Sequence, residues 1–161
     1  MKQHSVGIDF GTSTTLIAVS DDSGDARIIP IGQTTPWMPS VAALDSTGAL
    51  VVGEAALAVD PRRQIRSIKA RVTQGDTAVE VDGVHLDARS VMIAILGEAL
   101  RRAEAAMPGA IRNLRQVYLG CPALWNGAQR RLLADVAHEL GLPVDVADII
   151  DEPVEIGRAH V

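Results

Sequence analysis

The stretch GIDFGTSTT, residues 7–15, decides the expected fold and chemistry. Alternating apolar residues over 6–10 predict a β-strand, and Gly11 allows a tight turn after it. Hydroxyl-bearing residues follow at 12–15, and successive backbone N–H groups in such a turn form a concavity that binds anions. The carboxylate of Asp9 would face Mg²⁺ or its water shell. A hairpin turn with solvated hydroxyls explains the same residues, so the local pattern leaves both interpretations open.

The segments on either side of this stretch predict an α/β chain with a mixed sheet. The first three strands are expected as an antiparallel meander, because their connections are short. A long helix should begin after Asp87 and end at Pro108, and a second should run from Asn126 to Leu140, with Gly141 after its end. The expected strands are 6–10, 14–20, 26–31, 115–121 and 144–150, with hairpins at 40–52 and 79–86 and a short helix at 54–59.

Length and composition exclude several classes of protein. The 161 residues are 47% hydrophobic and 22% charged, which is typical of one globular domain. A net charge of −5 and only 2% aromatic residues argue against a nucleic-acid partner. No apolar run is long enough to cross a bilayer, and the first residues do not form a signal peptide. With a single cysteine, Cys121, the expected setting is cytoplasmic, away from any membrane.

Other phosphate and catalytic motifs are absent from the sequence. It contains no Gly-x-x-x-x-Gly-Lys-Ser/Thr loop and no Gly-x-Gly-x-x-Gly after a strand, which disfavours P-loop and dinucleotide-binding proteins. It also lacks a His-Glu-x-x-His zinc motif and a Gly-x-Ser-x-Gly nucleophile elbow. The expected chemistry therefore depends on the stretch at 7–15 and on further segments along the chain that match the same class of protein.

Six segments, in order along the chain, together resemble the Hsp70 chaperone family within the actin-like ATPase superfamily. They are VGIDFGTS at 6–13, TTP and PSV at 34–36 and 39–41, LVVGEAA at 50–56, SIK at 67–69, CPALWN with QR at 121–126 and 129–130, and IIDEP at 149–153. The resemblance implies a ribonuclease H-like lobe, in which helices flank the mixed sheet and a small α+β subdomain is inserted. Two departures are Leu124, where the family has an aromatic residue, and Asp151, where it has asparagine.

The resemblance also implies a role for each matching residue, with ATP or ADP and Mg²⁺ as cofactors. Gly11, Thr12, Ser13 and Thr14 would line the β- and γ-phosphates, and Asp9 would contact Mg²⁺ through water. Lys69 would reach the γ-phosphate and help to place the attacking water. Glu152 would orient water near the metal, and Pro122 and Arg130 would take part in the switch between nucleotide states. Without the resemblance, Lys69 reads as an exposed lysine and Glu152 as a solvated turn carboxylate.

The expected domain organisation is a truncated first lobe over residues 1–154. Its core would comprise 1–36 and 109–154, with the inserted subdomain at 37–108. Residues 155–161 do not continue the family pattern and match the translation of a common sequencing adapter, so a non-native tail is expected. The second phosphate loop and the adenosine-binding segment are absent from the 161 residues, so no ATP turnover is expected from them alone.

The partners implied are nucleotide and, for the parent protein, unfolded peptide clients and co-chaperones. Two alternatives remain open within the superfamily: an actin-like, filament-forming structural protein and a small-molecule kinase. ATP-dependent polymerisation would distinguish the first. A sugar- or acid-binding constellation would distinguish the second, and none is visible in the sequence.

Overall fold

A mixed sheet of six strands forms the centre of the computed structural model, which describes residues 3–152. Its order is β11-β10-β1-β2-β3, and β4 pairs with β2. The strands are β1 (His4–Phe10), β2 (Thr14–Ser20), β3 (Ala26–Ile29), β4 (Met38–Pro39), β10 (Leu114–Cys121) and β11 (Ile149–Asp151). The first three form the predicted antiparallel meander, whereas β10 runs parallel to both β1 and β11. The predicted α/β class with a mixed sheet is therefore confirmed.

The segment between β4 and β10 builds two small sheets and most of the helices. One sheet holds β5 (Ala42–Leu44), β6 (Leu50–Val52) and β7 (Gln64–Ile65), and the other holds β8 (Ala78–Val81) and β9 (Val84–Asp87). The helices here are α1 (Glu54–Leu57), the 3₁₀ turn η1 (Pro61–Arg63), α2 (Ile68–Thr73) and α3 (Ala88–Ala106). After β10 come α4 (Gly127–Glu139) and the 3₁₀ turn η2 (Val146–Asp148).

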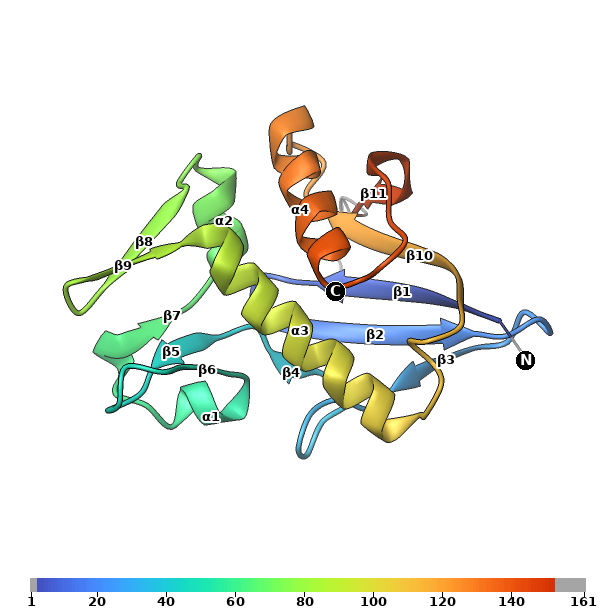
Figure 1. Cartoon of the computed structure of the whole chain (residues 1–161), viewed down its shortest axis with the longest axis horizontal. Coiled ribbons are helices and arrows are strands. Elements are labelled where there is room, and N and C mark those ends of the chain that lie inside the picture. The colour runs from blue at the N-terminus through green and yellow to red at the C-terminus, as the bar shows by residue number, and fades with distance from the viewer. Residues whose placement is uncertain (1–2, 153–161) are drawn as a thin grey trace, which may run out of the picture.

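Helices α3 and α4 lie together on one side of the central sheet (Figure 1). Strand residues alternate between the two faces, so every second side chain of β1, β2 and β10 packs into the core beneath these helices. The buried set on this face includes Val6, Ile8, Phe10, Ile17, Val19, Val117, Leu119 and Cys121. The intervening residues point to the opposite face, where the candidate site lies.

Both long helices begin at the predicted capping residues. The side chain of Asp87 accepts a hydrogen bond from the backbone of Arg89, and Asn126 forms a reciprocal capping box with Gln129. Gly141 follows α4 with a positive φ of 79°, as expected for the residue after a helix end. The apolar residues that recur at helical spacing along α3 are all buried, namely Val91, Ile95, Leu96, Ala99, Leu100 and Ala103.

Two predicted strands differ from the observed ones, and one observed helix was not predicted. Residues 144–150 do not form one strand, because Asp145 and Asp148 bond reciprocally and close the turn η2 before β11 begins. The third strand ends at Ile29, where Pro30 can donate no backbone hydrogen bond. Helix α2 was not predicted, because its six residues are too few to show helical periodicity.

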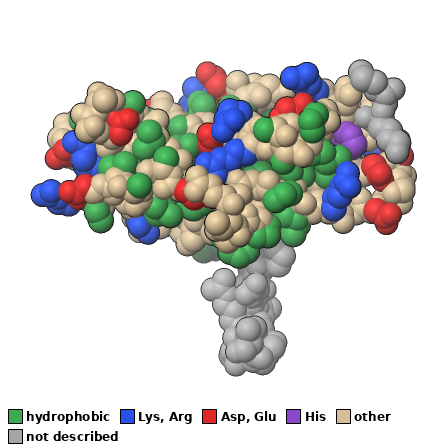
Figure 2. All heavy atoms as spheres, turned by 90° about the horizontal axis from the view of Figure 1, so that it is seen from below, with side chains coloured by type: hydrophobic (Ala, Val, Ile, Leu, Met, Phe, Trp, Pro, Cys, Tyr) green, Lys and Arg blue, Asp and Glu red, His purple; other side chains and the backbone are tan. Residues whose placement is uncertain are grey.

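The charged surface matches the unremarkable composition. Basic residues pair with carboxylates, as Arg62 does with Asp60 and Arg115 with Asp22. Figure 2 shows side chains of both signs interspersed with hydrophobic ones on the face seen from below. None of the helices in residues 3–152 is both long and apolar enough to cross a membrane. The division into a core and an inserted subdomain stays a prediction, and the proposed tail at 155–161 lies outside the described residues.

Candidate functional site

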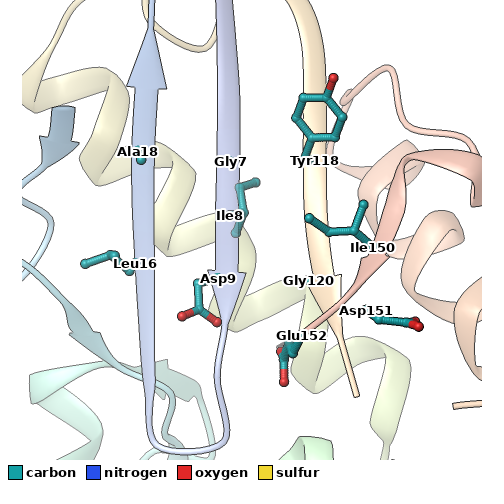
Figure 3. Close-up of a pocket in the computed structure, with 10 residues that line it drawn as sticks. All are labelled: Gly7, Ile8, Asp9, Leu16, Ala18, Tyr118, Gly120, Ile150, Asp151 and Glu152. Atoms are coloured by element: carbon teal, nitrogen blue, oxygen red, sulfur yellow. The ribbon is translucent and has the colours of Figure 1, made fainter. Parts of the chain in front are cut away.

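A pocket of about 510 Å³ opens on the sheet face opposite the two helices. Its floor is made of small residues from three adjacent strands, namely Gly7 of β1, Ala18 of β2 and Gly120 of β10. Figure 3 shows the carboxylates of Asp9 and Glu152 at one end of this pocket and Tyr118 at the other. The small floor residues leave the space open, and the two carboxylates give one end its negative charge.

The predicted phosphate-binding turn lies between β1 and β2, next to Asp9. The backbone N–H of Gly11 donates to the carbonyl of Thr14 at 2.9 Å, and a Cβ at Gly11 would come within 2.6 Å of that oxygen. Only glycine therefore fits this turn without a shift of the backbone. Residues 12–14 are exposed, so their hydroxyl and backbone groups are accessible to a ligand.

Ser40, which directly follows β4, makes hydrogen bonds to the same turn. Its backbone N–H donates to the carbonyl of Ser13 at 2.9 Å, and its hydroxyl lies 2.8 Å from that of Thr15 in a buried hydrogen bond. Polar groups buried in this way are usually hydrogen-bonded, because an unpaired one would be costly. The turn is thus held by a hydrogen bond within it and by hydrogen bonds from Ser40. The sequence analysis assigned no role to Ser40.

Lys69 and Glu152, which are 83 residues apart in sequence, form an ion pair between Nζ and Oε1. The Lys69 side chain is only 2% exposed, whereas that of Glu152 is 34% exposed. Glu152 reaches this position because its backbone N–H donates to the carbonyl of Cys121 at 2.8 Å. Its side chain lies against Gly120, where a Cβ would approach Glu152 Cγ to 3.3 Å. The tertiary fold thus places a buried cation against a carboxylate at the rim of the pocket.

Two aromatic rings enclose the ammonium group of Lys69. Its Nζ lies 5.9 Å from the ring centroid of Phe10 and 5.9 Å from that of Trp125. Both distances fall within the range in which a ring face attracts a cation. A buried ammonium without such partners would be strongly unfavourable, so the rings and Glu152 together explain how this charge is accommodated.

The electrostatics of Asp9 connect it to the same pair. Partial desolvation raises the pKa of its carboxyl, the negative charge of Glu152 raises it further, and the positive charge of Lys69 lowers it. The three side chains therefore interact, although they come from β1, α2 and the end of β11. A divalent cation close to Asp9 would offset the repulsion between the two carboxylates.

The two predicted switch residues lie beside this cluster. The guanidinium of Arg130 donates to the carbonyl of Trp125 at 3.0 Å and forms an ion pair with Asp151, next to Glu152. The carbonyl of Pro122 accepts from the backbone N–H of Trp125 at 3.0 Å. The segment from Pro122 to Arg130 thus joins the start of α4 to the end of β11.

Comparison with known proteins adds an independent observation. The chain is 32% identical over 162 aligned residues to proteins named "Chaperone protein DnaK" from Thermotoga neapolitana and Thermotoga maritima. It is 30% identical to the protein of the same name from Thermosipho africanus. Each alignment covers 99% of this chain. Over nearly its whole length, the chain is therefore similar to one part of these DnaK chaperones.

The chain spans about a quarter, 26%, of the length of these relatives. No protein-family model matches it. The structure brings together most of the residues that the family resemblance singled out. Asp9 and Glu152 line one end of the pocket, and buried Lys69 pairs with Glu152. The turn 11–14 follows Asp9 closely in the chain, and Arg130 contacts the residue before Glu152.

Four residues of the cluster were missed in the sequence, namely Phe10, Ser40, Thr73 and Trp125. Phe10 and Trp125 stand inside segments that carry the resemblance, but nothing in their spacing relates them to Lys69. One signal was available for Trp125, which is one of only two tryptophans in the chain and follows directly on the Pro-Ala-Leu segment. A buried indole requires a hydrogen-bond acceptor for its N–H group, and in this structure the acceptor is the hydroxyl of Thr73.

Proposed function

We propose that this chain is the ATP-binding lobe of an Hsp70-like chaperone ATPase and holds the phosphates of Mg-ATP at the turn 11–14. The observation that carries this proposal is the convergence of one buried lysine and two carboxylates beside a glycine turn with exposed hydroxyls. Kinases and NTPases recurrently combine backbone amides, a lysine and carboxylate-bound Mg²⁺ around transferable phosphates.

The residues present fit both parts of such a ligand. Exposed N–H and hydroxyl groups at 12–14 suit phosphate oxygens, and the ammonium of Lys69 adds a positive charge. Mg²⁺ prefers oxygen ligands and retains several waters, so Asp9 and Glu152 would hold it mainly through water. When bound, Mg²⁺ would neutralise part of the negative charge of the phosphates.

The role proposed for each residue follows from its position in the site and from its charge. The turn 11–14 would bind and orient the phosphates, and Asp9 would hold Mg²⁺ through water. Lys69 supplies a positive charge, and the two rings around its ammonium group restrict the position of that charge. Glu152 is partly exposed at the pocket rim, so its carboxylate can accept a hydrogen bond from a water there and orient it. Arg130 and Pro122 would transmit changes at Glu152 to α4.

We propose the actin-like, ribonuclease H-like arrangement for this lobe, with residues 37–108 as the inserted subdomain. ATP hydrolysis, peptide clients and co-chaperones are proposed for the whole protein, by similarity to relatives named as chaperones. For residues 1–161 alone we expect weak nucleotide binding and no turnover.

The test is a titration of the ¹⁵N-labelled chain with Mg-ATP, followed by amide chemical shifts. The expected result is saturable shifts at residues 11–14 and at Glu152. Lys69→Met should weaken this binding. Asp60→Asn serves as the control, because the Asp60 side chain interacts with Arg62 and Arg63, which the proposed site does not use. Shifts confined to other surfaces, or none at millimolar Mg-ATP, would contradict the proposal. A measured ATPase rate that Lys69→Ala abolishes would contradict the expected lack of turnover.

A further inference from the structure

Helix α2, which carries Lys69, has little stability of its own. It spans only six residues, and helices this short do not persist without tertiary contacts. It starts after Ser67, which has a positive φ of 57° and makes no side-chain capping bond. The direction of the Lys69 side chain therefore depends on groups outside the helix.

Those groups come from the loop before α4 and from its first turn. The indole Nε1–H of Trp125 donates to the hydroxyl of Thr73 at 2.8 Å, and that hydroxyl donates to the backbone carbonyl of Lys69 at 2.8 Å. One turn further along, the side-chain amide of Gln129 donates to the carbonyl of Val72 at 2.8 Å. The end of α2 is thus fastened to the 125–129 segment by directional hydrogen bonds.

Trp125 acts on Lys69 in two ways at once. Its ring lies 5.9 Å from Nζ, and its N–H group reaches the Lys69 backbone through Thr73. The residue is 3% exposed, so the indole has no water to replace this partner. A phenylalanine at this position would keep a ring face over the ammonium but could donate nothing to Thr73.

We propose that Trp125 is a positioning residue for Lys69, acting through the Trp125–Thr73–Lys69 hydrogen-bond relay. The relay sets where the ammonium stands between Phe10 and Glu152, and it connects that position to the segment containing Pro122 and Arg130. The inference deepens the proposed function, because the value of a positioned Lys69 rests on its role toward a phosphate.

The test uses the chemical reactivity of the lysine amines. The chain has only two lysines, Lys2 and Lys69, and trypsin separates them, so mass spectrometry can follow the acylation of each by an amine-reactive ester. Reaction at Lys69 measures how often its amine leaves the buried position. Trp125→Phe removes the hydrogen bond from the indole to Thr73, and Thr73→Val removes both hydrogen bonds of the relay. Trp125→Phe should speed Lys69 acylation by about threefold to tenfold, as expected for the loss of one buried hydrogen bond, and Thr73→Val by at least as much.

Two comparisons separate positioning from general destabilisation. Because both substitutions break the same relay, the double variant should react no faster than the faster single variant. Trp37→Phe changes the other tryptophan, which is half-exposed in a loop, and should leave the Lys69 rate unchanged. Urea unfolding of every variant shows how much of the increase global opening explains.

The outcomes bear separately on the two proposals. Unchanged Lys69 rates in both single variants, a double variant that multiplies their effects, or rates explained fully by lower global stability would each overturn the positioning role. In the unsubstituted chain, Mg-ATP should also alter the Lys69 rate. Absence of that effect would count against the proposed nucleotide site and would leave the relay result standing.

Discussion

The buried ion pair of Lys69 and Glu152 makes an asymmetric prediction about stability. Glu152→Gln removes the negative charge and keeps an acceptor oxygen, so the ammonium of Lys69 stays buried without its counter-charge. Lys69→Met removes the buried charge and leaves a partly exposed carboxylate that water can solvate. The substitution at the more exposed residue should therefore be the more damaging one.

The size of the effect follows from burial. Removing one partner of a fully buried pair costs about 3–5 kcal/mol, because the other charge is left unpaired. Glu152 is 34% exposed, and Asp9 and both rings remain near the ammonium, so solvent and these groups reduce the penalty. We expect Glu152→Gln to lower the free energy of unfolding by about 2 kcal/mol, or the melting temperature by about 4–8 °C. Methionine packs well between aromatic rings, so Lys69→Met should stay within about 1 kcal/mol of the unsubstituted chain.

Urea unfolding at neutral pH, followed by circular dichroism, measures both variants and their combination. The double variant should recover nearly the stability of Lys69→Met, because no unpaired buried charge remains in it. Equal stability of Glu152→Gln and the unsubstituted chain would refute the reasoning. So would a larger loss for Lys69→Met than for Glu152→Gln, since either result would mean that the lysine charge is not buried as described.

Three further substitutions test the site and the fold that supports it. Gly11→Ala would bring a methyl group to 2.6 Å from the carbonyl of Thr14, so we expect a destabilised turn and weaker Mg-ATP binding, both measurable by amide chemical shifts. Asn126→Ala removes the capping box of α4 and should cost about 1 kcal/mol in urea unfolding. Burial acts to raise the pKa of Glu54, but the hydrogen bonds from Arg102 and the backbone of Gln33 outweigh burial and lower the pKa from its ordinary value of 4.5. The ionised carboxylate therefore stabilises the fold above pH 4.5, and this stabilisation is lost as the pH falls through the lowered pKa. Glu54→Gln should therefore destabilise the chain at pH 7, with a difference that shrinks in urea titrations at progressively lower pH.

Much of the architecture was predictable because its signals are local. Alternation of apolar residues marked the strands around Asp9, and both long helices begin at capping residues visible in the sequence. The errors had two different causes, one local and one long-range. Reciprocal bonding of Asp145 and Asp148 replaced part of a strand with a turn, and α2 is a helix only because of contacts made far along the chain.

The sequence by itself determined the strand order of the meander, the glycine turn after Asp9 and, through motif order, the family resemblance. Only the tertiary structure decided that Lys69 is buried, that Glu152 is its partner and that Trp125 and Phe10 enclose it. The physical reason is that strand alternation and helix caps act over a few residues, and a linear pattern records them. Burial of a charge depends on residues from four separate segments, and no local pattern encodes their distance.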